Sequence, residues 1–243
     1  GETCAAAEGL RCSPDGCANL CDEARASNSY IGCEYWPTTV LNSQVAIEFD
    51  FAVVVANPQL VAAEVVVDRA GSEVARAMIP PGSLVTLPLP WVSELKGVFA
   101  EERSEVVRGG AYRVASDVPV IVYQFDPLQY RIERDCLGEA TETADDGQCY
   151  AFTNDASLLL PTHVLTGSYL ALSRQTMVLD LPAGTARNEV ASPGFVAIVA
   201  TEDGTTVDIV STSHVEPSRD GTIPALAPGG TTSVTLDRGD VLQ

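Results

Sequence analysis

FAVVVANPQLVAAEVVV (residues 51–67) is the stretch that decides the fold, because the chain repeats its pattern as FVAIVATEDGTTVDIV (residues 195–210). Each stretch reads as two Val-rich strands joined by a turn, which predicts a β-hairpin. Two further landmarks recur in the same order: PTTVL (37–41) with PTHVL (161–165), and PPGSLVTL (80–87) with APGGTTSVTL (227–236). Their offsets of roughly 125 to 150 positions predict one β unit duplicated in tandem.

Short strands rich in Val and Ile, punctuated by Pro and Gly, account for most of the remaining sequence. In the first unit we predict them at 45–56, 61–68, 83–89, 111–115 and 118–125. A turn at Ser116–Pro119 is expected between the last two, because Asp117 favours a turn and Pro119 fixes φ. In the second unit we predict them at 158–161, 168–173, 176–181, 195–201, 206–210 and 231–236.

Helical signal is confined to Ala18–Ser27 and Trp91–Lys96. The predicted fold class is therefore all-β, a tandem pair of related antiparallel β-sandwich units preceded by a small disulfide-rich segment. We expect a Cys-rich N-terminal segment at 1–33, a first sandwich unit at 34–150, and a second at 151–243 that is cut short at its C-terminus.

Seven cysteines indicate an oxidising compartment. Five lie within the first 33 residues, so one of them stays unpaired or finds a partner upstream. Their spacing matches no common zinc motif, which favours disulfides over a metal site. Cys136 and Cys149 bracket an acidic loop and would close a 14-residue ring worth about 3 kcal/mol. We predict a Cys136–Cys149 disulfide and, in the N-terminal group, Cys21–Cys33.

Thirty-three acidic residues against fourteen basic ones give a formal net charge of −19. This charge repels phosphate backbones and anionic headgroups, so we expect no nucleic-acid partner. No apolar run approaches the roughly 18 to 20 residues of a transmembrane helix, and the 46% hydrophobic content suffices for a core. The chain starts at Gly1 without a leader, so we expect an export signal to have been removed or to lie outside it.

Catalytic and metal-binding patterns are weak. The two histidines, His163 and His214, stand in no metal-ligand spacing, and the chain holds no G-x-S-x-G, P-loop or G-x-G-x-x-G motif. Paired carboxylates could serve glycoside cleavage, but the chain has so many acidic residues that such pairs identify no particular site. Residues 145–147 (DDG) and 202–204 (EDG) offer calcium-type ligands, but the second reads first as a hairpin turn. We predict no catalytic residue, no cofactor and no metal site.

A resemblance comes from the order of the strands SDVPVIVYQFDP (116–127), ASLLLPTHVLTGSYLALS (156–173), GFVAIVATEDGTTVDI (194–209) and GDVLQ (239–243). This succession resembles the IgGFc-binding protein N-terminal domain family, which includes part of an animal mucus protein and many extracytoplasmic bacterial proteins. The resemblance covers roughly residues 30–243, and CDEARASNSYIGCEYW (21–36) is similar to the start of bacterial members. It implies a secreted or surface-attached, non-enzymatic β module for adhesion or recognition, with no catalytic residue to carry over.

Three functional hypotheses follow. The first is an extracellular module that binds a protein or glycan, with long loops such as 133–149 carrying recognition. The second is a structural spacer of a surface protein, and the third is a secreted hydrolase. Coplanar aromatic rings on one face would indicate carbohydrate recognition, whereas buried rings would favour the spacer. The aromatic candidates are Tyr35, Trp36, Trp91, Tyr130 and Tyr150.

Overall fold

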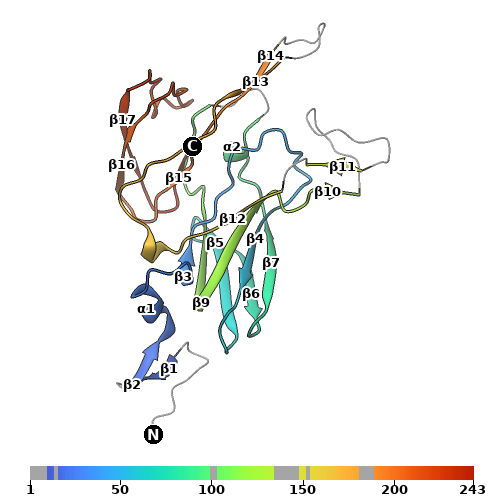
Figure 1. The fold of residues 1–243 in the computed structure, drawn as a ribbon, viewed down its shortest axis with the longest axis vertical. Coiled ribbons are helices and arrows are strands. Elements are labelled where there is room, and N and C mark those ends of the chain that lie inside the picture. The colour runs from blue at the N-terminus through green and yellow to red at the C-terminus, as the bar shows by residue number, and fades with distance from the viewer. Residues whose placement is uncertain (1–9, 14–15, 99–102, 134–147, 152–153, 181–188) are drawn as a thin grey trace.

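Antiparallel strands dominate the computed structural model, which describes residues 10–13, 16–98, 103–133, 148–151, 154–180 and 189–243 (Figure 1). Within these ranges the helical elements are α1 (Leu20–Arg25), α2 (Ser93–Lys96) and the 3₁₀ turn η2 (Thr162–Val164). Asn19 caps α1, because its side-chain oxygen accepts the Cys21 N–H at 2.8 Å. The all-β class is confirmed, and α1 and α2 lie inside the two segments predicted to be helical.

One long strand, β9 (Tyr112–Asp126), organises the main sheet. Its first half lies between β5 (Ala63–Arg69) and β3 (Gly32–Tyr35), and its second half lies between β4 (Phe51–Ala56) and β12 (Asp155–Leu158). Beyond these, β6 (Ser72–Ile79) pairs with β5, and β7 (Leu84–Leu89) pairs with β4. All of these pairings are antiparallel, so β9 belongs to two ladders at once.

The predicted turn at Ser116–Pro119 is wrong, because these residues lie inside β9. The β5 ladder ends at Ser116 and the β4 ladder begins at Ile121, so Pro119 falls where its missing N–H breaks neither ladder. The side chain of Gln59 donates to the Pro119 carbonyl at 2.9 Å. Asp117, expected to fold back on its own backbone, accepts the Glu64 N–H at 2.8 Å instead.

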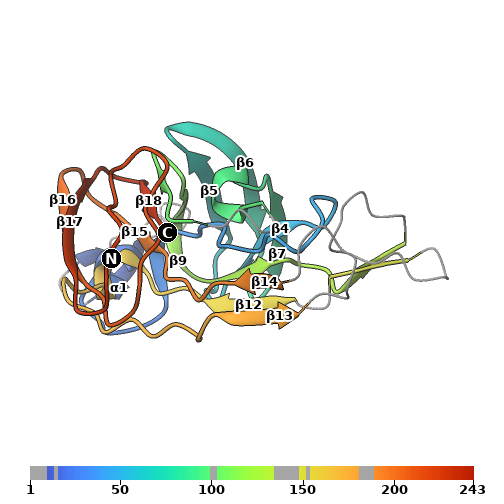
Figure 2. The same cartoon turned by 90° about the horizontal axis from the view of Figure 1, so that it is seen from above.

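Alternation with a period of two places the core of this sheet. Val114, Val118, Val120 and Val122 of β9 are fully buried, as are alternate residues of β4 and β5. They form one apolar cluster to which Tyr35 also belongs, and the Tyr35 hydroxyl donates to the Val120 carbonyl at 2.6 Å. Figure 2 shows β5 and β6 in the upper part of the view, above β4, β7 and β12. The two ladders therefore enclose a single core.

The hairpin expected at 51–67 is also wrong. β4 and β5 do not pair with each other, because each pairs with β9, which lies between them. The strand expected at 45–56 begins only at Phe51, and β6 was not expected at all. β6 carries charged residues and is mostly exposed, with only Ile79 fully buried, so its sequence lacks the alternation that identifies a strand.

The remaining strands form small ladders. Residues 195–210 are not a hairpin either, because the turn at 201–204 joins β15 to β16 and each has another partner. The pairs are β1 (Leu10–Ser13) with β2 (Gly16–Asn19), β10 (Arg131–Ile132) with β11 (Cys149–Tyr150), β13 (Met177–Asp180) with β14 (Glu189–Ser192), and β16 (Thr205–Val210) with β17 (Thr231–Leu236). A three-stranded ladder joins β15 (Ile198–Val199), β18 (Val241–Leu242) and β8 (Val106–Val107).

The landmarks of the sequence repeat do not occupy equivalent positions. The strand after PPGS, β7, pairs with β4, which is the first strand of its motif, whereas the strand after APGG, β17, pairs with β16, which is the second. Ladders also cross the boundary predicted at residue 150, since β12 pairs with β9 and β18 pairs with β8. The division into units at 34–150 and 151–243 stays a prediction, and the strands on either side of it are hydrogen-bonded together.

Candidate binding site

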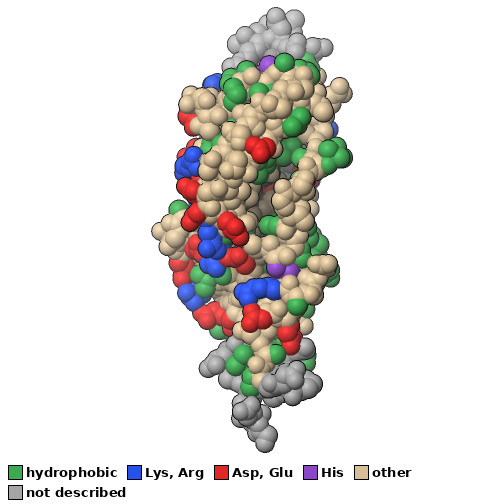
Figure 3. All heavy atoms as spheres, turned by 90° about the vertical axis from the view of Figure 1, so that its left-hand side faces the viewer, with side chains coloured by type: hydrophobic (Ala, Val, Ile, Leu, Met, Phe, Trp, Pro, Cys, Tyr) green, Lys and Arg blue, Asp and Glu red, His purple; other side chains and the backbone are tan. Residues whose placement is uncertain are grey.

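A stretch without acidic residues marks the candidate site. Residues 156–178 contain no Asp or Glu, although the chain as a whole has 33, and Arg174 is the only Lys or Arg among them. Figure 3 shows Asp, Glu, Lys and Arg side chains crowding the left and lower parts of one face, while hydrophobic side chains follow its right-hand edge. The stretch is a local exception on a strongly acidic molecule.

The apolar side chains of this stretch are largely exposed. Leu170 is 91% exposed and Leu172 is 87% exposed, and both come from a segment predicted to be a strand at 168–173. That prediction is wrong, because the described structure assigns these residues to no strand. Other large hydrophobic residues of the stretch are also exposed, namely Leu158, Leu160, Leu165, Tyr169, Met177 and Val178. Contiguous exposed apolar surface of this kind is typical of interaction sites.

A cavity of about 260 Å³ lies where this stretch meets the main sheet. Its floor comes from the end of β9 and the loop before β4, and its rim comes from β12 and the segment that carries Arg174. The residues that line it are Val40, Leu41, Asn42, Gln124, Asp126, Asp155, Ser157, Arg174 and Phe195. Six of these nine residues are polar or charged, and Val40, Leu41 and Phe195 supply the apolar part of the lining.

Asp126 is the buried acid of the cavity, with 6% of its surface exposed. Burial raises the pKa of Asp126 to about 6, although the Val40 N–H, the Asn42 amide and the Lys96 ammonium act in the opposite direction. One carboxylate oxygen accepts the Val40 N–H at 2.9 Å and the other accepts from Asn42 Nδ2 at 3.3 Å. The carboxyl group is thus held in place, and it changes charge near neutral pH.

Lys96 supports the loop beside the cavity. Its ammonium donates to the backbone carbonyls of Asn42, at 3.0 Å, and of Val45, and it lies 5.4 Å from the centre of the Trp91 ring. Burial lowers the pKa of Lys96, while the nearby carboxylates of Asp126 and Glu48 raise it. These contacts fix the conformation of residues 42–45, and through Asn42 they fix the position of the Asp126 carboxyl.

Arg174 differs from several arginines of the chain that are held in ion pairs, such as Arg108, Arg113 and Arg238. Within the described residues its guanidinium makes no hydrogen bond or ion pair. By contrast, Arg113 pairs with Glu34 at 2.6 Å, and Arg238 pairs with the same Glu34 at 2.7 Å. A free guanidinium beside exposed leucines is suited to bind a carboxylate.

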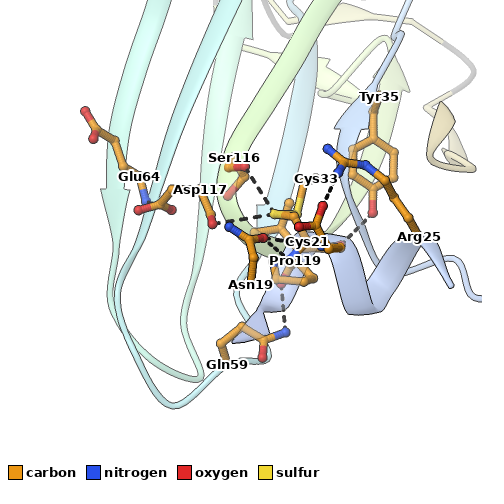
Figure 4. Close-up of a disulfide and its surroundings, with 12 residues drawn as sticks. Asn19, Cys21, Arg25, Cys33, Tyr35, Gln59, Glu64, Ser116, Asp117 and Pro119 are labelled. Atoms are coloured by element: carbon orange, nitrogen blue, oxygen red, sulfur yellow. Dashed lines mark hydrogen bonds and ion pairs between the residues drawn. A yellow bond between two sulfur atoms is a disulfide. The ribbon is translucent and has the colours of Figure 1, made fainter. Parts of the chain in front are cut away.

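The N-terminal disulfide lies beside Ser116 and Asp117 of β9, away from the cavity residue Asp126 at the end of that strand (Figure 4). Cys21 of α1 and Cys33 of β3 are joined, which is the pair proposed from the sequence. The sulfur of Cys21 lies 3.5 Å from the Asp117 carbonyl oxygen, so the bridge packs against the middle of β9. Cys149 is also disulfide-bonded, but Cys136, its predicted partner, lies outside the described residues. The Cys136–Cys149 pairing therefore stays a prediction.

The aromatic candidates do not form a flat row. Tyr35 is fully buried, and Trp36 and Trp91 are half-buried with their indole N–H groups bonded to Thr162 Oγ1 and to the Phe49 carbonyl. Tyr130, which is 49% exposed, meets Tyr150 edge-on with ring centres 6.0 Å apart. Their packing gives no stacking platform for a sugar.

The histidines and acidic motifs considered for chemistry lie apart. His163 is in η2, and His214 is exposed with its Nε2 3.3 Å from Glu216. Residues 145–147 lie outside the described part of the chain, and residues 202–204 form the turn before β16. Among the described residues, no group of three or more His, Cys, Asp or Glu side chains is placed to hold a metal ion.

Sequence reasoning missed Asp126, Arg174, Leu170 and Leu172 as site residues. The signal that could have identified this face is the gap in acidic residues at 156–178, which is visible in the sequence alone. The cavity gave no such signal, because its lining comes from segments far apart in the chain.

Comparison with known proteins places the stretch in context. The family model described as IgGFc binding protein matches residues 155–243, and this is the family that the order of strands resembles. The match includes the acid-free stretch, Arg174 and Phe195, but not residues 30–154, where the resemblance was also expected. Searches of curated proteins and of solved structures found no match. In the part of the chain that the structure describes, no helix is long and apolar enough to cross a membrane.

Proposed function

From the match of residues 155–243 to a family of binding domains, we propose that the protein is a non-enzymatic extracytoplasmic module that binds a protein ligand. The observation that supports the proposal most is the exposed apolar surface of residues 156–178, which carries no acidic residue and falls inside the matched range. Surfaces of this kind mark contact sites for other macromolecules. Adhesion at a cell surface is the setting we propose for it.

The disulfides support the extracytoplasmic part of the proposal. Cys21–Cys33 is formed, and Cys17 and Cys149 are disulfide-bonded as well. Such bonds persist in oxidising compartments and are rare in the reducing cytosol. A protein ligand is favoured over a glycan, because the aromatic rings considered for sugar stacking are packed rather than presented on one face.

The structural spacer is the second candidate, and the same packed aromatics favour it. Trp36 and Trp91 pack against the apolar cluster of the main sheet, as expected if they stiffen a spacer rather than contact a ligand. The two candidates differ in one measurable respect, because a spacer needs no ligand of its own.

An array of secreted proteins and glycans, probed with the disulfide-intact chain, tests the proposal. We expect at least one protein on the array to bind, with loss of binding after reduction of the disulfides. The absence of any saturable ligand would favour the spacer, and binding confined to glycans would replace the protein ligand. A matched probe carrying Leu60→Ser, at a 96% exposed position on the β4–β5 connection, controls for nonspecific apolar adhesion.

A further inference from the structure

The stretch at residues 167–173 has the properties of a strand that lacks its partner. Within the described part of the chain these residues make no backbone-to-backbone hydrogen bond and belong to no ladder. Neighbouring side chains satisfy only isolated groups, such as the Ser168 carbonyl, which accepts from Thr166 Oγ1 at 3.2 Å. Unpaired backbone groups of this kind are what a second strand uses when it adds to a sheet edge.

Leu170 and Leu172 give this stretch an apolar face. In an extended chain, side chains two residues apart point to the same side. The two leucines are 91% and 87% exposed, so the surface they offer is uncovered in the isolated chain. Burying a leucine side chain yields about 1.5 to 3 kcal/mol, so covering both is a substantial driving force.

The stretch continues a ladder that already exists. β13 and β14 pair up to Met177 and Ser192, and beyond that pair the chains still approach closely at Arg174 and Gly194. A Cβ atom on Gly194 would lie 1.9 Å from the Arg174 carbonyl oxygen, so only glycine permits this approach. Before Arg174 no described strand continues the pairing, and residues 167–173 come directly before Arg174 in the chain, so an extension of the ladder would run through them.

The positive charge of Arg174 indicates which kind of partner this stretch binds. Arg174 is the only Lys or Arg in residues 156–178, and its guanidinium has no partner within the described residues. The net charge of −19 would favour a basic ligand at long range, but charges beyond about 8 Å are screened at physiological salt. The direct contact at Arg174 therefore determines which charge the ligand carries at this position. A carboxylate next to Arg174 forms a charge-assisted hydrogen bond.

From these four observations we infer that residues 167–173 accept an extended peptide strand from a partner protein. The strand carries alternating apolar side chains that cover Leu170 and Leu172, and one carboxylate that pairs with Arg174. This inference rests on the proposed function as a protein-binding module and specifies the ligand class and the way it is held.

Fluorescence anisotropy with a labelled synthetic peptide of alternating Val and Thr and a single Glu provides the test. We expect saturable binding to the disulfide-intact chain, weakened on the order of tenfold or more by the double variant Leu170→Ser, Leu172→Ser. Leu60→Ser, equally exposed but distant in sequence and off this face, should bind as the wild type does. Identical thermal melting of all variants shows that the fold is intact.

Two altered peptides separate strand addition from simple apolar adhesion. N-methylation of every second residue removes backbone donors while keeping the side chains, and it should abolish binding. Replacing Glu by Lys should weaken binding to the wild type by about tenfold, and Arg174→Glu should reverse that preference. Equal binding of the N-methylated peptide, or preference of the wild type for the Lys peptide, would overturn the inference.

The other possible occupants of this face are also outcomes of the test. Concentration-dependent dimerisation in sedimentation experiments that the double variant abolishes would assign the face to a second copy of the chain. Binding to neutral phosphatidylcholine vesicles would assign it to a lipid surface. Either result overturns the peptide strand. If the array identifies a protein ligand that the double variant still binds, this inference fails while the proposed function stands.

Discussion

The strand β9 and the stretch 165–178 both carry apolar residues at alternate positions, but these residues lie in opposite environments. Val118, Val120 and Val122 are fully buried between two ladders, whereas Leu170 and Leu172 are almost fully exposed. The difference lies in the neighbours, because β9 has a hydrogen-bonded strand on each side and residues 167–173 have none in the described structure. Alternating apolar residues therefore predict a segment that pairs with other strands. Within the described structure the protein provides such strands for β9 but not for residues 167–173.

The two regions also differ in the size of their cores. The cluster around β9 joins residues from seven strands and reaches α2, whereas the cluster around β17 contains five buried residues, among them Leu236 and Ile223. We interpret the first region as the part that stabilises the fold. None of the residues of this second cluster lies in the stretch 156–178.

The largest expected effect is loss of the first core. Phe51→Ala removes a fully buried ring that packs against Trp91 and Tyr112, and we expect it to lower the free energy of unfolding by about 3 to 5 kcal/mol. Urea denaturation measures the change. Leu60→Ala serves as the exposed control, with an expected effect within about 0.5 kcal/mol. Comparable losses in both variants would show that the β9 region does not dominate stability.

Next in size is the disulfide beside β9. Cys21→Ser with Cys33→Ser opens a loop with a sequence separation of 12, and we expect a loss of about 2 to 3 kcal/mol. The urea midpoint of the double variant, compared with that of each single variant, measures it. Either single variant should lose as much as the double one, since each removes the same bond. A single variant that keeps the wild-type midpoint would contradict the role given to this bridge.

The smallest expected effect is the pH-dependent contribution of the Asp126 carboxyl, in the cavity, to stability. Because the pKa of Asp126 is about 6 in the folded protein and about 4 in an unfolded chain, the folded state holds its proton more tightly. Stability from this group is then present below about pH 4 and declines as pH rises to about 6. Asp126→Asn removes the decline and should raise the free energy of unfolding by about 1 to 2 kcal/mol at pH 8.

Thermal melting of wild type and Asp126→Asn across this pH range measures the difference. It should be small at pH 4, grow to about pH 6 and stay constant above. A change at the neighbouring Gln124, such as Gln124→Glu, cannot replace this measurement. The amide oxygen of Gln124 accepts the Thr38 N–H at 3.1 Å, and an amide does not titrate as the Asp126 carboxyl does. A difference between the two proteins that does not change with pH would show that Asp126 does not titrate as described.

Strand composition could be predicted from the sequence, but strand partners could not. The Val-rich runs at 51–56, 63–69 and 120–122 are strands as expected, because β-branched residues with a period of two fit a half-buried sheet. The hairpin at 51–67 was expected because the two runs are close in sequence. In the structure, β9 lies between them, and the pairs from Val65–Ser116 to Arg69–Tyr112 are about 45 to 50 residues apart in sequence, so no local signal reveals that arrangement.

The site was less predictable than the fold. The exposed leucines at 170 and 172 were read as part of a paired strand, since alternation alone does not show whether a partner exists. The Asp126 carboxyl was invisible, because its burial depends on Asn42, Lys96 and the backbone of Val40, which come from other segments. Only the missing acids at 156–178 were accessible to sequence reasoning.

The pairing of β12 with β9 bears on how the protein can be dissected. A fragment ending near Tyr150 would keep nearly all of the first core but would strip Tyr123–Asp126 of their neighbour on one side. The backbone N–H and C=O groups of these four residues would then be unpaired on that side, and a bare strand edge of this kind templates aggregation. Recombinant pieces intended for ligand screening should therefore extend at least through Leu158, so that this edge stays capped.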